Sequence, residues 1–190
     1  MENNNIMVVP AVYSKSFRFD TDDGYFLSEN NGEFGGKIDF IGNNGVSYTV
    51  LERNPHYMFS INDDIYVLGG LAHMTFAVGY IWKLSNINGK WEEEREVELG
   101  GDPQVYTIYK GEIYIIVYTR AYDNPGDLGM SELIKVTIAE ENIEVQQLVK
   151  TITLPTNSMI AKDHMLYVGL RGGLAIVNLK NNNIRFYTKK

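Results

Sequence analysis

The chain of 190 residues contains no cysteine, only five prolines and only three histidines. The lack of cysteine excludes disulfides, zinc–thiolate sites, iron–sulfur clusters and a thiol nucleophile. Small secreted folds usually depend on disulfides, so a chain without them is more typical of a reducing compartment. We therefore expect a cytoplasmic protein.

Long apolar runs and a basic amino terminus are also missing. The chain begins Met1-Glu2-Asn3-Asn4-Asn5 and continues with a short apolar run over residues 6–12. A signal peptide needs a basic start and a longer apolar core, and a transmembrane helix needs about 20 apolar residues. We therefore expect no signal peptide in this sequence and no membrane partner, although the sequence does not tell whether a leader was removed. We regard residues 6–12 as a candidate additional strand.

Cations are outnumbered by acids. The 17 lysines and arginines against 24 aspartates and glutamates give a net charge of −7. An acidic chain repels phosphate backbones, so nucleic acid is not an expected partner, whereas a basic protein is attracted. The same charge would also serve solubility alone.

What the chain does contain is a fourfold repeat. Tyr25, Tyr66, Tyr114 and Tyr167 each lie in a short β-branched or aromatic run that follows a polar turn. They recur at intervals of roughly 40 to 50 residues, the length of a four-stranded propeller blade. We predict an all-β fold of four consecutive four-stranded antiparallel blades in a small or partial β-propeller. The expected single domain spans residues 1–190, with blades over about 13–53, 54–101, 102–154 and 155–190.

Two aspects of this architecture stay open. The acidic residues 92–98 could pass as a helix, but Trp91, Val97 and Leu99 fit an edge strand better, and charges on an outer strand block aggregation. Four blades could close into a ring, remain an open arc or pair with a second chain. The sequence does not decide among these, nor does it give the oligomeric state.

The last repeat carries a family resemblance. Residues 165–179 read Met-Leu-Tyr-Val-Gly-Leu-Arg-Gly-Gly-Leu-Ala-Ile-Val-Asn-Leu. This segment resembles bacterial β-propeller repeats, which have a Leu-Tyr-Val strand, a glycine-rich turn and a Gly-Leu-x-Ile-Val-Asn strand. The resemblance implies a fold rather than a function, because such repeats occur in sensor, scaffold and surface proteins.

The candidate site is the face where the second and third strands of each blade are joined. Loops over 28–36, 69–79 and 119–131 are predicted to be longer than a hairpin needs, while 171–173 is tight, and long loops on a rigid scaffold tend to be functional. The connections between blades add Arg53, His56 and Asp102 to this face. Its mixture of aromatic, acidic and basic side chains is typical of a protein-binding surface. The candidate partner-binding residues are Glu29, Glu33, Phe34, Arg53, His73, Phe76, Arg120, Tyr122, Asp123, Asp127 and Arg171.

No catalytic or metal-binding pattern stands out. Residues 20–24 begin like a calcium loop, but Asn31 occupies the place of the distal glutamate, so a polar turn is the simpler interpretation. His56 and His73 could supply only half of a metal site. Acid pairs in the loops could serve glycoside hydrolysis but are usually just solvated. We predict no catalytic residue, no metal, no cofactor and no enzymatic activity.

Two functional hypotheses follow. The first is a non-enzymatic protein-binding module, in its specific form an immunity or inhibitor protein that neutralises a basic bacterial toxin. The second is a small-ligand or glycan-binding module, because loops that combine aromatic and acidic side chains suit sugars. The loops differ in length and content, which argues against one sugar site repeated in every blade.

Overall fold

The computed structural model of the chain describes residues 16–73, 76–119, 130–139, 142–152 and 155–188. Over these residues the chain forms sixteen β-strands and one short 3-10 turn, with no α-helix. Consecutive strands pair antiparallel within four separate sheets. The predicted all-β fold of four consecutive four-stranded antiparallel blades is confirmed.

The sheets are numbered in chain order. Sheet 1 contains β1 (Arg18–Thr21), β2 (Gly24–Asn30), the 3-10 turn η1 (Gly32–Phe34), β3 (Gly36–Gly42) and β4 (Ser47–Leu51). Sheet 2 contains β5 (Pro55–Ile61), β6 (Asp64–His73), β7 (Phe76–Ile87) and β8 (Lys90–Glu98). Sheet 3 contains β9 (Asp102–Tyr109), β10 (Glu112–Thr119), β11 (Met130–Ala139) and β12 (Asn142–Ile152). Sheet 4 contains β13 (Thr156–Lys162), β14 (Met165–Leu170), β15 (Gly173–Asn178) and β16 (Asn183–Thr188).

The hairpin turns follow from local residue chemistry. Asn62 and Asp63, between β5 and β6, have φ values of 51° and 69°. Asp163 and His164, between β13 and β14, have φ values of 49° and 62°. Two successive residues with positive φ give the turn whose twist matches the flanking strands, and Asn and Asp tolerate that conformation best.

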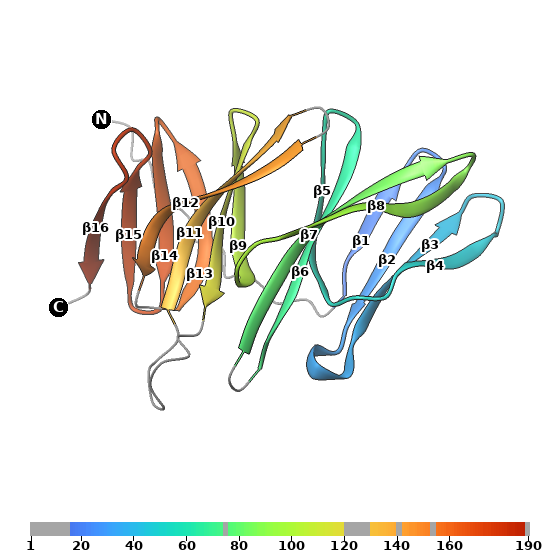
Figure 1. Cartoon of the computed structure of the whole chain (residues 1–190), viewed down its shortest axis with the longest axis horizontal. Helices are drawn as coiled ribbons and strands as arrows, with labels where there is room; N and C mark the ends of the chain where they lie inside the picture. The colour runs from blue at the N-terminus through green and yellow to red at the C-terminus, as the bar shows by residue number, and fades with distance from the viewer. Residues whose placement is uncertain (1–15, 74–75, 120–129, 140–141, 153–154, 189–190) are drawn as a thin grey trace, which may run out of the picture.

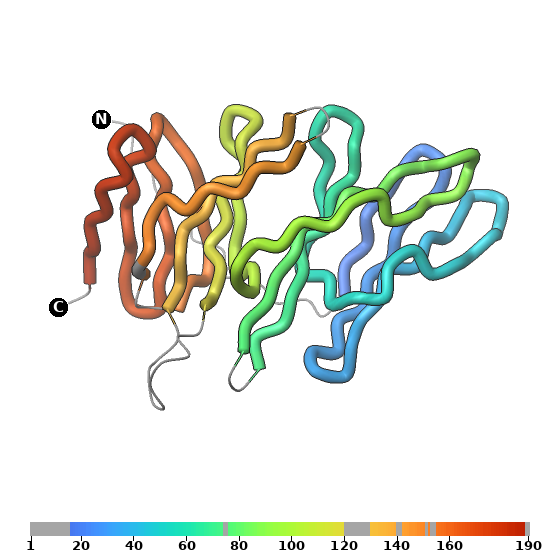
Figure 2. The backbone as a smooth tube through the Cα atoms, in the orientation of Figure 1, coloured from blue at the N-terminus to red at the C-terminus, as the bar shows by residue number. Residues whose placement is uncertain are grey.

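The four sheets are packed in series as an open arc. Figure 1 shows sheet 1 at one end of the long axis and sheet 4 at the other, with sheets 2 and 3 between them, and Figure 2 shows the same order in the backbone trace. The described part of the chain therefore forms a partial β-propeller in which the first and last blades do not meet. No helix among these residues is long and apolar enough to span a bilayer.

Three apolar cores fill the three gaps between neighbouring sheets. Phe26 and Phe40 of sheet 1 pack with Trp82 of sheet 2, and Leu68 of sheet 2 packs with Ile115 of sheet 3. The third core joins sheets 3 and 4. Sheets 2 and 3 therefore bury both faces, which explains why β6 and β10 contain runs of consecutive buried residues. Strands β2 and β14 instead alternate between buried and more exposed residues, because each end sheet has a neighbour on one face alone.

The turn over residues 20–24 fastens sheet 1 to sheet 2. The carboxylate of Asp23 accepts hydrogen bonds from Trp91 Nε1 at 3.0 Å and from Asn86 Nδ2 at 3.1 Å. The backbone N–H of Trp91 donates to the Tyr48 hydroxyl at 2.7 Å. This acidic turn therefore contributes to the contact between two blades.

Two loop predictions need correction. The loop expected over 69–79 is wrong, because β6 continues to His73 and β7 starts at Phe76. The loop expected over 28–36 is shorter than predicted, because only the five residues between Asn30 and Gly36 lie outside the strands. Residues 92–98 form most of strand β8, as predicted. Residues 120–129 of the expected third loop lie outside the described residues.

Candidate functional site

The connection between β2 and β3 forms a rigid, projecting turn. Within it, the Phe34 N–H donates to the Asn31 carbonyl at 3.2 Å, and the Gly35 N–H donates to the Gly32 carbonyl at 3.0 Å. Gly32 and Gly35 have φ values of 60° and 87°, a conformation in which a side chain would be strained. The turn is therefore held by its own backbone and presents Phe34 at its tip.

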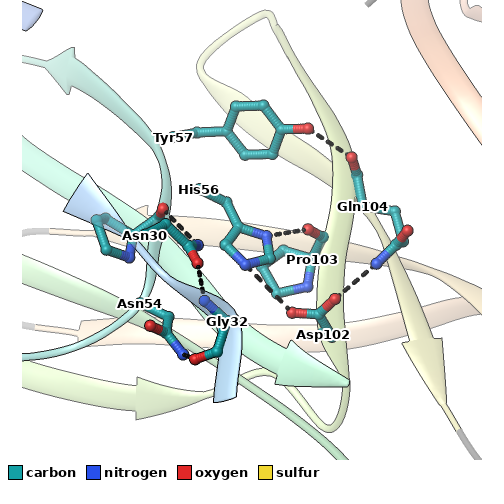
Figure 3. Close-up of polar contacts among 9 residues, drawn as sticks. Asn30, Gly32, Asn54, His56, Tyr57, Asp102, Pro103 and Gln104 are labelled. Atoms are coloured by element: carbon teal, nitrogen blue, oxygen red, sulfur yellow. Dashed lines mark hydrogen bonds and ion pairs between the residues drawn. The ribbon is translucent and has the colours of Figure 1, made fainter. Parts of the chain in front are cut away.

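Side-chain amides on both sides of the contact between sheets 1 and 2 fasten this turn. Asn54 Nδ2 donates to the Gly32 carbonyl at 2.7 Å, and Asn30 Nδ2 donates to the Pro55 carbonyl at 3.0 Å. Figure 3 shows these amides bridging the two sheets. Gly36 lets the strands approach closely, because a Cβ there would lie 2.7 Å from the Arg53 carbonyl oxygen. The turn is thus fastened to the start of sheet 2.

Phe34 is the outstanding side chain of this turn. It is 84% exposed, the largest value among the exposed large apolar residues of the described chain. Burial of an aromatic ring from water is strongly favourable, so Phe34 is a candidate contact residue. Beside it, Glu33 Oε2 lies 2.6 Å from His73 Nε2 of sheet 2, and the His73 ring contacts Phe76 edge-on at 6.1 Å.

An open hollow of about 600 Å³ lies at the foot of this turn, between sheets 1 and 2. Its lining residues are Glu29, Asn31, Gly32, Glu33, Phe34, Gly35, Gly36, Lys37, Glu52, Arg53, Asn54 and Leu71. Two of the charges are held in place: Lys37 Nζ lies 2.7 Å from Asp39, and Arg53 Nε lies 3.9 Å from Glu96. The lining therefore combines three carboxylates, two cations and one aromatic ring.

The predicted site residues divide into three groups. Glu29, Glu33, Phe34 and Arg53 line the hollow, with His73 paired to Glu33 at its edge. His73 and Phe76 belong to strands rather than to the long loop expected there. Arg171 is brought elsewhere, to the β14–β15 turn of sheet 4 at the opposite end of the arc. The remaining candidates, Arg120, Tyr122, Asp123 and Asp127, lie outside the described residues.

Sequence reasoning missed Asn54, Lys37, Glu52 and Leu71 as parts of this hollow. Lys37, Glu52 and Leu71 look like ordinary strand-end residues, and nothing in the sequence brings them together. Asn54 stands directly before Pro55 at a blade connection. A residue before proline is held in an extended conformation, which is the one signal that marked this position.

A second polar cluster lies between sheets 2 and 3 (Figure 3). His56 Nδ1 lies 2.9 Å from the Pro103 carbonyl oxygen, and His56 Nε2 lies 3.5 Å from Asp102 Oδ1. Gln104 Nε2 donates to Asp102 Oδ2 at 2.6 Å, and the Tyr57 hydroxyl donates to the Gln104 carbonyl at 2.5 Å. Two residues that the sequence placed at blade connections, His56 and Asp102, are thus direct partners.

Burial controls the charge of Asp102. The residue is 4% exposed, and its Oδ1 atom has no hydrogen-bond donor. Burial in apolar surroundings raises the pKa of Asp102 to about 6, although the positive charge of His56 and the hydrogen bond from Gln104 both act to lower it. The carbonyl of Pro103 can only accept, so whenever the His56 ring is neutral its one proton lies on Nδ1 and Nε2 has none to offer to Asp102.

The described residues contain no group of three or more histidine, aspartate or glutamate side chains that could hold a metal ion. His56 and His73, considered from the sequence as half of a metal site, have different partners, Asp102 and Glu33. The chemistry of the hollow is therefore that of charge pairing, amide hydrogen bonds and aromatic contact.

Comparison with protein-family models gives no match, and comparison with curated proteins gives none either. Among solved structures, the chain is similar to cobalt-substituted Synechocystis apocarotenoid oxygenase, with 10% identity and a TM-score of 0.46 over 87% of this chain and 46% of that one. It is also similar to the N-terminal domain of Nup159, with 7% identity and a TM-score of 0.36 over 93% of this chain and 60% of that one. The chain thus spans less than two thirds of either structure. Similarities at this level do not transfer a function.

Proposed function

We propose that the chain is a non-enzymatic protein-binding module whose contact surface is the projecting turn with Phe34 and the hollow beside it. The observation that carries this proposal is the combination of an 84% exposed aromatic ring with a turn that is clamped by backbone and amide hydrogen bonds. A rigid aromatic anchor loses little conformational entropy on binding, and such anchors dominate the energy of protein interfaces.

The charges favour a basic partner. The hollow is lined by Glu29, Glu33 and Glu52 against Lys37 and Arg53, and Lys37 is already paired with Asp39. A lysine or arginine of a partner would meet these carboxylates, and the net charge of −7 would steer it there. In its specific form the proposal is an immunity or inhibitor protein that neutralises a basic toxin in a bacterial cytoplasm.

The test is to capture binding proteins from the native source with the intact chain and with two variants. Phe34→Ala removes the anchor, while Ile87→Ala removes another exposed apolar side chain, 49% exposed, at the β7–β8 hairpin of sheet 2. A basic protein that binds the intact chain and Ile87→Ala, but binds Phe34→Ala at least about tenfold more weakly, supports the proposal. A partner that binds all three equally well places the interface elsewhere.

A second candidate is a module that binds a small ligand or glycan. The volume of the hollow favours it, because about 600 Å³ lies within the usual range of small-molecule sites. Phe34 would then stack on a sugar ring while Glu29 and Asn31 accept or donate hydrogen bonds. This alternative is supported if a glycan binds the intact chain but not Phe34→Ala, and if no protein is captured from the native source.

A further inference from the structure

The two end sheets of the arc have outer faces of different chemistry. Side chains alternate along a strand, so the residues between the buried ones point away from the neighbouring sheet. On sheet 1 the outward residues of β1, β2 and β3 are Arg18, Asp20, Tyr25, Leu27, Glu29, Lys37, Asp39 and Ile41. Arg18 lies 2.7 Å from Asp20 and also covers the Tyr25 ring at 3.7 Å. This face is mostly polar, with Leu27 exposed near its centre.

The outer face of sheet 4 is mostly apolar. Its outward residues on the four strands, other than glycine, are Ser158, Ile160, Lys162, Met165, Tyr167, Leu174, Ile176, Asn178, Asn183, Arg185 and Tyr187. Register places Tyr167 between Ile160 and Ile176, and pairs Leu174 with Tyr187. Ile160 is 60% exposed and Tyr187 is 50% exposed. Two cations and no acid accompany these apolar side chains on the four described strands.

An end sheet with an apolar outer face is unusual in a stacked repeat. Terminal repeats generally carry a polar outer face, because each internal repeat is covered by its neighbours and the ends are not. Sheet 1 follows this rule and sheet 4 does not. Ile160 and Tyr187 are exposed on its two edge strands, and the apolar side chains between them are half-buried, so this face still offers apolar area to a contact.

The distribution of charge along the chain indicates what covers it. Residues 155–190 contain six cations and one acid, Asp163, which gives +5. Because the whole chain carries −7, residues 1–154 carry −12. A sheet 4 face against a second sheet 4 face would bring two positive units together. A sheet 4 face against a sheet 1 face would join this positive unit to residues 16–53, where seven acids and three cations give −4.

We propose that the outer face of sheet 4 binds the outer face of sheet 1 of a second copy of this chain, head to tail. Leu27 of one copy then lies among the apolar side chains around Tyr167 of the other, and Lys162 and Arg185 lie opposite the carboxylates of the sheet 1 face, Asp20, Glu29 and Asp39. Such a contact joins two different surfaces, so it can be made twice in a closed pair.

The available area supports a pair that makes the contact twice. Four strands about 4.8 Å apart and about 20 Å long give roughly 400 Å² of flat area per face. One contact between two faces buries roughly 800 Å², which is small for a stable interface, whereas two contacts bury roughly 1,600 Å², the standard size. Glu29 and Lys37 belong both to the sheet 1 face and to the lining of the hollow, so self-association and partner binding compete there.

The experiment is sedimentation of the full chain, free of any partner, over a concentration series at low and high salt. The expected result is a concentration-dependent pair that salt weakens, because screening reduces the attraction between the two ends. Ile160→Asp, which places a charge in the apolar face, should weaken pairing at least about tenfold. Ile87→Asp, at an exposed apolar position of sheet 2, should leave pairing unchanged, and circular dichroism confirms that both variants are folded.

Charge reversal tests the direction of the contact. Arg185→Glu and Asp20→Lys should each weaken pairing, and a chain that carries both changes should recover it, because the two faces again have opposite sign. A monomer at every concentration overturns the proposal, and binding of that monomer to vesicles of anionic lipid would assign the face to a membrane surface instead. Pairing that is unchanged by both Ile160→Asp and Arg185→Glu also overturns the proposal.

Discussion

Replacement of Asp102 by asparagine should make the protein more stable at alkaline pH and remove a loss of stability that the intact chain suffers between pH 4 and pH 8. Asp102 is buried between sheets 2 and 3, and its Oδ1 faces the Nε2 atom of His56, which lacks a proton in the neutral ring. In Asp102→Asn the side-chain amide can donate an N–H to that nitrogen whenever the ring is neutral, while its oxygen still accepts from Gln104. The variant therefore supplies the hydrogen bond that the ionised carboxylate lacks.

The magnitude follows from the pKa of Asp102. The folded protein raises this pKa from 3.8 to about 6, so between these values the native state binds more protons than the unfolded state. Stability from this group is therefore complete below about pH 4 and is lost as the pH rises through about 6. Since a tenfold change in acidity is worth about 1.4 kcal/mol, the loss amounts to about 3 kcal/mol.

The assay is urea unfolding at pH 5 and pH 8, read by tryptophan fluorescence. The intact chain should gain stability on acidification relative to Asp102→Asn, and at pH 8 the variant should be more stable by up to about 3 kcal/mol. Asp63→Asn serves as the control, because Asp63 is exposed in the β5–β6 turn and asparagine tolerates its positive φ. This control variant should keep the pH dependence of the intact chain.

A destabilised Asp102→Asn variant at pH 8 would refute the reasoning. That result would mean that the carboxylate is stabilised in the folded state by its hydrogen bond from Gln104 and by the charge of His56 more than burial disfavours it. Equal pH dependence in the intact chain and in Asp102→Asn would show that Asp102 titrates normally and that its burial carries little free energy.

Three further predictions concern packing, and urea unfolding checks each of them. Gly69→Ala should cost about 1 to 3 kcal/mol, because a Cβ there would lie 2.1 Å from the Asn54 carbonyl oxygen; an unchanged midpoint would mean that the strands separate easily. Ile115→Ala should cost about 2 to 5 kcal/mol, because this side chain is fully buried between sheets 2 and 3. Trp82→Phe should cost about 1 kcal/mol or somewhat more, because it removes the 2.6 Å hydrogen bond from the indole to Glu96.

The sequence was sufficient to predict the four sheets, but it did not predict whether the first and last sheets meet. The repeated tyrosine runs and the Asn- and Gly-rich turns predicted four antiparallel units because both are local signals. The same runs do not distinguish inner from outer blades, because residues 25–27 and 165–168 of the end sheets are as continuously apolar as residues 65–68, and only their burial alternates. Closure of the ring stayed undecided because it depends on how far each blade turns relative to the last, which no local pattern specifies.

The site was less accessible from the sequence. Glu33, Phe34 and Arg53 were selected because they lie near the connections between strands, and the structure places them around one hollow. The pairing of His56 with Asp102 joins residues 46 positions apart through the packing of two sheets, and the sequence has no signal for such a contact. Predicted loop lengths failed at 69–79 because glycine residues there mark close strand contacts, not a turn.

The order of the strands has a consequence for how the chain folds. Each strand pairs with the one before or after it in the sequence, so the hydrogen-bonded ladders close through short hairpins. Pairing between near neighbours carries a small loop-closure cost, and β-proteins are slow folders mainly when their ladders join distant segments. Any one of the four sheets can therefore form first, and docking of neighbours then stabilises sheets 2 and 3 most, because each of them buries both faces.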